Sequence, residues 1–190
     1  MFSIYTIGHS TTPIEVFLGA LTAHGIQRLV DIRTIPQSRH NPQFAKQALE
    51  QSAVAGGIEY IWMRELGGRR RPRRDSINSG WRNESFRGYA DYMQTPEFAA
   101  ALDHLTALVA GRVAIMCAEA VPWRCHRSLV ADALTVRGVA VGDIFIQPGG
   151  SSTVKLHTLT RFARVEGDRL WYPPEEPEQL SLIPPSPVAG

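Results

Sequence analysis

The sequence of 190 residues has only two cysteines, no long hydrophobic run and no secretory signal. Two cysteines cannot form a disulfide framework, so both are expected to be free thiols in a reducing compartment. No segment approaches the roughly 18 apolar residues that a membrane helix needs, and the N-terminus lacks a basic region and a cleavage site. These absences argue against a disulfide scaffold and a membrane protein, and we expect a cytoplasmic one.

The charge is small in sum but uneven along the chain. The formal net charge is +2, yet residues 69–74 hold five arginines and residues 175–178 hold three glutamates. Such asymmetry favours a polyanionic partner, DNA or RNA.

Strand-like and helix-like segments alternate along the chain. The expected strands are residues 2–7, 29–32, 58–63, 113–116 and 139–146, and the expected helices are 14–21, 43–53, 86–93, 96–109 and 128–137. This alternation predicts an α/β fold of three layers, with a mainly parallel sheet and helices on both faces. Residues 159–172 predict a small β-hairpin. We expect one domain over residues 1–172 and a proline-rich, disordered tail over residues 173–190.

Residues 112–138 contain the densest group of reactive side chains. A buried strand is predicted to enter a helix through a short polar loop, which directs free backbone N–H groups and the positive end of the helix dipole to one point. The side chains of this loop are Cys117, Glu119, Arg124, Cys125, His126 and Arg127. They predict an anion-binding site with chemical activity.

Three motifs follow one another along the chain: Ile7-Gly8-His9-Ser10, Asp31-Ile32-Arg33-x-x-Pro36-x-Ser38, and Cys117-Ala118-Glu119-x-x-Pro122-x-x-Cys125-His126-Arg127. In this order they resemble the motifs of the DUF488 family. The resemblance covers residues 3–147 and implies a compact α/β domain with a loose association with DNA repair. It supplies no mechanism.

The candidate site residues follow the ends of several predicted strands. Because ligands of open α/β sheets bind at the carboxyl ends of the strands, we expect these segments to share one cavity. Cys125 is the candidate nucleophile, since a helix N-terminus and nearby arginines lower the pKa of a thiol. The catalytic candidates are Glu119, Cys125, Asp31, His9 and Cys117, and the phosphate-binding candidates are Ser10, Arg33, Arg39, Arg124, His126 and Arg127.

These residues also have structural alternatives. Cys117 ends an apolar strand and is compatible with a small core residue, and Glu119 or Asp31 with a salt bridge that braces the rim. The thiols, imidazoles and carboxylates are acceptable metal ligands, but no close CxxC or HxxxH pair is present. The sequence therefore assigns no metal ligands and requires no cofactor, and a metal site stays open as an alternative.

The arginine segment, residues 69–74, predicts contacts with nucleic acid, with a solvated loop as the alternative. Arginine suits bidentate phosphate binding, and nearby aromatic rings suit base stacking. The candidates are Arg69, Arg70, Arg71, Arg73, Arg74 and Tyr89.

The features together predict a nucleic-acid- or nucleotide-processing protein with a phosphate pocket, acting in DNA repair. Two alternatives remain open, a non-catalytic nucleic-acid-binding adaptor and a cysteine-dependent sulfur or phosphoryl transferase. The transferase is awkward because Cys117 and Arg124 are one residue too far apart for the anion cradle of cysteine phosphatases, and no glycine-rich segment lies between them.

The tail contains a segment that resembles the bacterial sliding-clamp-binding pentapeptide Q-L-S/D-L-F. It is Gln179-Leu180-Ser181-Leu182-Ile183, which departs from the pattern only by isoleucine at the last position. We expect Leu182 and Ile183 to fill a hydrophobic cleft of the clamp and Gln179 to form a hydrogen bond at its end, with the flanking prolines reducing the cost of ordering. A chance match and a tail folded back onto the domain are the alternatives.

A peptide covering residues 175–186 should bind the sliding clamp, and the double variant Gln179→Ala, Leu182→Ala should bind at least about 10-fold more weakly because both anchors are removed. Titration of both peptides with purified clamp measures this. Equal affinities, or no binding by either peptide, would remove the clamp as a partner.

Overall fold

The computed structural model describes residues 2–108 and 111–174, and a six-stranded sheet lies at its centre. The strands are β1 (Ile4–Gly8), β2 (Arg28–Asp31), β3 (Glu59–Trp62), β4 (Val113–Cys117), β5 (Val141–Ile146) and β6 (Ser152–Leu156). Their order is β3-β2-β4-β1-β5-β6; the first five in sequence are parallel, and β6 pairs antiparallel with β5. The predicted α/β fold with a mainly parallel sheet is confirmed.

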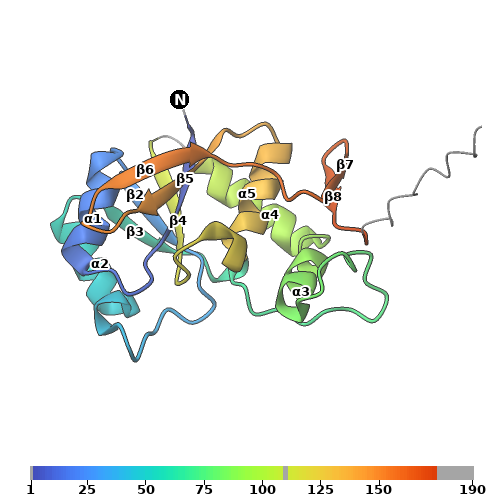
Figure 1. Cartoon of the computed structure of the whole chain (residues 1–190), viewed down its shortest axis with the longest axis horizontal. Coiled ribbons are helices and arrows are strands. Elements are labelled where there is room, and N and C mark those ends of the chain that lie inside the picture. Colours follow the sequence, from blue (N-terminus) through green and yellow to red (C-terminus); the bar gives the residue numbers. More distant parts are fainter. Residues whose placement is uncertain (1, 109–110, 175–190) are drawn as a thin grey trace, which may run out of the picture.

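Helices cover both faces of this sheet (Figure 1). They are α1 (Ile14–Ala23), α2 (Lys46–Ala55), α3 (Glu84–Tyr92), α4 (Pro96–Ala107) and α5 (Arg127–Val136). Helices α1 and α2 pack on one face, where Phe17 and Leu49 join Met116 of β4 in one hydrophobic core. Helices α3, α4 and α5 pack on the other face, and Cys117 belongs to that second core. Successive side chains of a strand point to opposite faces, so Cys117 points toward α5.

The C-terminal part differs from the expectation in one strand. Residues 149–152 predict only a loop, whereas β6 begins at Ser152 and forms the edge of the sheet. Its side chains are mostly exposed, so it lacks the apolar run that marks a buried strand. The predicted hairpin is present as β7 (Arg164–Glu166) and β8 (Arg169–Trp171), although its first strand begins later than expected.

The segment Gln179–Ile183 lies outside the described residues. Within the described part of the chain, none of the helices has the length and hydrophobicity of a membrane span.

A buried charged network fastens the segment after β6 to the sheet. The imidazole nitrogens of His157 each lie 2.9 Å from a carboxylate, Nδ1 from Asp143 of β5 and Nε2 from Asp132 of α5. Tyr172 donates to the second oxygen of Asp132 at 2.8 Å. Burial by itself lowers the pKa of His157, but the hydrogen bonds to the two carboxylates outweigh it and raise the pKa to about 9.

The free energy of unfolding should therefore fall between about pH 6.5 and pH 9. The pKa of about 9 in the folded chain exceeds the value of about 6.5 expected for an unfolded histidine, so the stabilisation by His157 is complete below pH 6.5 and is lost as the pH rises through 9. The loss should reach at most about 3 kcal/mol. Urea denaturation at a series of pH values measures it. His157→Gln should flatten the profile in this window and His104→Gln, at an exposed position, should not; an equally steep profile for His157→Gln would contradict the assignment.

Candidate active site

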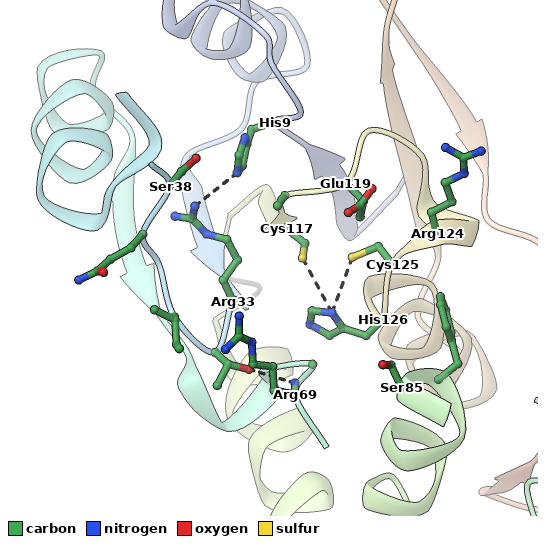
Figure 2. Close-up of a pocket in the computed structure, with 16 residues that line it drawn as sticks. His9, Arg33, Ser38, Arg69, Ser85, Cys117, Glu119, Arg124, Cys125 and His126 are labelled. Carbon is green, nitrogen blue, oxygen red and sulfur yellow. Dashed lines mark hydrogen bonds between the residues drawn. The ribbon is translucent and has the colours of Figure 1, made fainter. Parts of the chain in front are cut away.

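A cavity of about 350 Å³ opens at the carboxyl ends of β1, β2 and β4 (Figure 2). This volume lies in the range of small-molecule sites. Eight of the predicted site residues line it: His9, Arg33, Arg69, Cys117, Glu119, Arg124, Cys125 and His126. Asp31, Ser10 and Arg127 are not part of this lining, and neither is the exposed Arg39.

The parallel pairing of β1 with β4 brings the first and third motifs together. Gly8 pairs with Cys117, and the backbone N–H of His9 donates to the carbonyl of Cys117 at 3.1 Å. A Cβ at Gly8 would overlap the backbone carbonyl of Glu119. Glycine is therefore required for the loop after β4 to cross so close to β1.

Asp31 supports Arg33 from behind the cavity wall. The guanidinium of Arg33 donates to both carboxylate oxygens, with distances of 2.9 Å from Nε and 2.6 Å from NH2, and the hydroxyl of Tyr60 donates to one of them at 2.7 Å. Asp31 is fully buried. Its oxygens are committed to these donors, so the salt-bridge alternative describes Asp31 better than the role of general base.

His9 is a neutral acceptor for the same guanidinium. Its Nδ1–H donates to the carbonyl of Ser10 at 2.8 Å, and its Nε2 lies 3.3 Å from NH1 of Arg33. Burial, together with the charge of Arg33, lowers the pKa of His9 to about 4. Ser10 has a positive φ of 46°, an uncommon conformation for a residue other than glycine. His9 and Ser10 thus orient Arg33, and Ser10 does not reach the cavity.

Arg127 shapes the loop after β4. Its side chain is fully buried, and its NH1 and NH2 donate to the backbone carbonyls of Glu119 and Ala120. The prediction that Arg127 contacts a phosphate disagrees with this burial. Its charge nevertheless lies close enough to Cys125 to act on the thiol.

Cys117, Cys125 and His126 form a cluster at one side of the cavity, called here the thiol–imidazole cluster (Figure 2). The two Sγ atoms lie 3.8 Å and 3.7 Å from Nδ1 of His126. The other ring nitrogen, Nε2, lies 3.1 Å from the carbonyl of Ile32. A carbonyl accepts only, so Nε2 carries a proton and Nδ1 faces the sulfurs.

The two thiols of the cluster differ in acidity. Burial by itself raises the pKa of Cys125, but the hydrogen bond with Cys117 and the positive charge of Arg127 outweigh it and hold the pKa well below its usual value. The hydrogen bond with Cys125 and burial raise the pKa of Cys117. When the pair loses one proton, the negative charge is therefore favoured on Cys125 over Cys117.

A family model described as "Domain of unknown function DUF488" matches residues 13–134. The chain belongs to the DUF488 family. The match includes the second and third motifs and begins after the first, which ends at Ser10. Comparison with curated proteins and with solved structures finds no match.

The imidazole of His126 in this DUF488 protein is held between the backbone of Gly68 and the ring of Tyr89. A Cβ at Gly68 would overlap the imidazole, and the ring of Tyr89 lies 4.9 Å from it between centroids. Tyr89 is fully buried, and its hydroxyl donates to the carbonyl of Leu66 at 2.9 Å. The prediction that Tyr89 stacks on a nucleobase disagrees with this burial, and its role is to hold His126.

The arginine segment does not act as a unit. Arg70 lies 3.6 Å over the ring of Tyr92 and donates to backbone carbonyls, and the exposed Arg73 pairs with Asp75. Arg69 lines the cavity, and Arg71 and Arg74 are exposed. Only part of the segment is thus placed to meet a ligand.

The first turn of α3 contributes two lining residues that the sequence patterns did not indicate, Ser85 and Phe86. Asn83 caps this helix, accepting from the backbone N–H groups of Ser85 and Phe86 at 2.9 Å and 3.3 Å. The cap is a recognisable signal for a helix start, but nothing local indicates that this start meets the strand ends. Ser38, also on the wall, was visible as part of the second motif.

Gly68→Ala should displace His126 from the sulfurs and destabilise the protein by about 1–3 kcal/mol, because the added methyl group overlaps the imidazole. Denaturant unfolding measures the change. Gly19→Ala is the matched control: its Cβ would meet open space on helix α1, and it should stabilise by up to about 1 kcal/mol. Wild-type stability of Gly68→Ala would contradict this placement of His126.

Proposed function

We propose that this DUF488 protein is an enzyme that processes nucleotides or nucleic acids and binds a phosphate group of its substrate in this cavity. The observation that supports the proposal is that three arginines, Arg33, Arg69 and Arg124, are among the residues that line a cavity that also holds the thiol–imidazole cluster. Arginine offers paired N–H donors that match phosphate oxygens. Binding and reactive groups thus share one small volume.

The remaining walls of the cavity suit a ligand with a polar end and an aromatic end. Ser38 and Ser85 supply hydroxyl groups, whereas Ile35 and Phe86 supply apolar surface. The ring of Phe86 is held by stacking on Trp81, with 4.7 Å between centroids and 22° between planes. A nucleotide has this character, with its phosphate near the arginines and its base against Phe86.

Glu119 is the proposed general acid or base. Its side chain lines the cavity and is exposed (Figure 2). The buried Arg127 holds the backbone carbonyl of Glu119 and so fixes the loop that carries it. A carboxylate that is open to solvent and not engaged in a salt bridge can accept and donate protons, and its fixed backbone keeps it in place.

Cysteine-dependent transfer of a sulfur or phosphoryl group is the second candidate. It is favoured by the position of Cys125, two residues before the start of α5 and beside the guanidinium of Arg127. A thiolate there would attack a substrate bound by the arginines. This role requires a free thiol on Cys125, whereas the first candidate function does not, so the effect of blocking the thiol distinguishes the two.

Arg69→Ala and Arg124→Ala should each weaken binding of a nucleoside monophosphate by about 10-fold or more, because each removes charge-assisted hydrogen bonds worth roughly 1.5–3 kcal/mol. Isothermal titration with the full chain measures the affinity. Arg71→Ala is the matched control, an exposed arginine of the same segment outside the cavity lining, and should leave the affinity unchanged. Equal affinities for wild type and Arg69→Ala would contradict the phosphate pocket.

Incubation with defined single-stranded, duplex and modified DNA or RNA distinguishes an enzyme from an adaptor. Products formed by the wild type and not by Glu119→Gln would support the enzyme, and binding of nucleic acid without any product would support the adaptor. If Arg71 or Arg74 binds a phosphate of single-stranded DNA, its replacement by alanine should make the plot of log binding constant against log salt concentration less steep, by roughly 0.7 in slope.

A further inference from the structure

We propose that Cys117, Cys125 and His126 bind one zinc ion and leave its fourth coordination position open to the cavity. The three ligand atoms, two Sγ and Nδ1, lie within 4.8 Å of one another. They come from the end of β4 and the residues just before α5, so the fold and not a local sequence repeat brings them together.

The distances within the thiol–imidazole cluster match a tetrahedral zinc site. Zinc lies about 2.3 Å from sulfur and about 2.0–2.1 Å from a histidine nitrogen, which at tetrahedral angles separates sulfur from nitrogen by about 3.6 Å. The two observed separations are 3.8 Å and 3.7 Å. The two sulfurs lie within 4.8 Å of each other, against about 3.8 Å at tetrahedral angles. Movements of about 1 Å or less would therefore seat the ion.

Hydrogen bonding alone accounts poorly for two sulfurs at one nitrogen. Nδ1 of a neutral imidazole has a single lone pair and can accept from one S–H group only, yet the sulfurs of both cysteines lie near it, at 3.8 Å and 3.7 Å. A metal ion between the three atoms would use that lone pair and one electron pair from each thiolate. Three metal–ligand bonds would then replace the single hydrogen bond that Nδ1 can accept.

The surroundings of His126 are those of a metal ligand. Nε2 donates to the backbone carbonyl of Ile32 at 3.1 Å, and such a partner on the second nitrogen fixes the tautomer and the orientation of ligating histidines. Gly68 and Tyr89 hold the ring from two sides. The imidazole is thus oriented toward the sulfurs before any metal binds.

The fourth position of such an ion would face the cavity, because all three ligands belong to its lining. Three protein ligands and one open position are the arrangement of catalytic zinc, which lowers the pKa of bound water to about 7. Glu119 lines the same cavity and would accept one proton from this water, leaving hydroxide on the metal. The use of the water rests on the proposed function, whereas the binding of zinc does not.

Metal binding can be measured without a substrate. The full chain, stripped with a chelator under reducing conditions, is titrated with Zn²⁺ and separately with Co²⁺. We expect one equivalent of either ion per chain, and the cobalt form should show thiolate-to-metal charge transfer in the near ultraviolet and the intense visible bands of four-coordinate Co²⁺. No retained zinc, or cobalt bands without thiolate charge transfer, would overturn the proposal.

Variants locate the ion. Cys117→Ser, Cys125→Ser and His126→Gln should each lower zinc affinity by more than about 100-fold, the upper end of the loss caused by changes to outer-shell groups. His104→Gln, on the surface, should keep wild-type affinity, with circular dichroism to check that each variant is folded. Unchanged affinity in both cysteine variants would overturn the proposal.

Thiol labelling gives a measurement on the wild type alone. One equivalent of zinc should protect both Cys117 and Cys125 from alkylation, and removal of zinc should restore labelling. Equal labelling with and without zinc would overturn the site and leave the cysteine nucleophile. Because no substrate is present, this outcome is independent of whether the chain processes nucleotides.

Discussion

The parallel pairing of β1 with β4 is the constraint on which the site depends. The register runs from Ile4 opposite Val113 to Gly8 opposite Cys117, so both strands end at the same level of the sheet. A shift by one residue would turn Cys117 to the α1 face, because side chains alternate along a strand. Cys117 would then no longer lie beside Cys125 and His126, and the cavity would lose one of its reactive groups. This register requires glycine at position 8, because the loop after β4 passes through the space that a Cβ of residue 8 would occupy.

Buried charges fix the groups around the cavity. Burial of an ion pair costs several kcal/mol per ion in desolvation, and the attraction between the partners recovers this only with good geometry. Asp31 and Arg33 meet that condition with a bidentate contact and an added donor from Tyr60. The buried charge of Arg127 is less completely hydrogen-bonded, because its Nε has no hydrogen-bond partner among the described residues. We infer that these charges serve mainly to orient Arg33 and the loop of Glu119, because apolar residues could fill the same space at lower cost.

The sequence predicts the sheet and the cavity location well, because both follow from local patterns. Buried parallel strands are continuous apolar runs, and polar residues follow each of them. The contacts that each polar side chain makes cannot be predicted in the same way. Nothing local distinguishes Arg127, which turns inward to backbone carbonyls, from Arg124, which is exposed. The burial of Tyr89 likewise depends on how α3 packs, and a helix stripe of aromatic residues does not reveal which face is covered.

The thiol–imidazole cluster shows why spacing along the chain is an incomplete guide to ligands. Rules such as CxxC describe ligands held by one tight turn, whereas Cys117 and Cys125 are eight positions apart and approach through the strand-to-helix connection. Adjacent residues such as Cys125 and His126 are seldom considered as a ligand pair. Here the loop before α5 directs both side chains to the same side (Figure 2).

The charge of the cluster also affects how well the cavity holds an anion. Without a metal, a thiolate on Cys125 would oppose an incoming phosphate, and Asp31 already balances the charge of Arg33. Zinc bound by two thiolates and a neutral imidazole would be electrically neutral, so the charges of Arg69 and Arg124 would act on the phosphate against the single carboxylate of Glu119. At an effective dielectric constant of about 20, one unit charge about 4 Å away is worth about 4 kcal/mol. Zinc and phosphate should therefore each strengthen the binding of the other, because a coupling between two ligands is reciprocal.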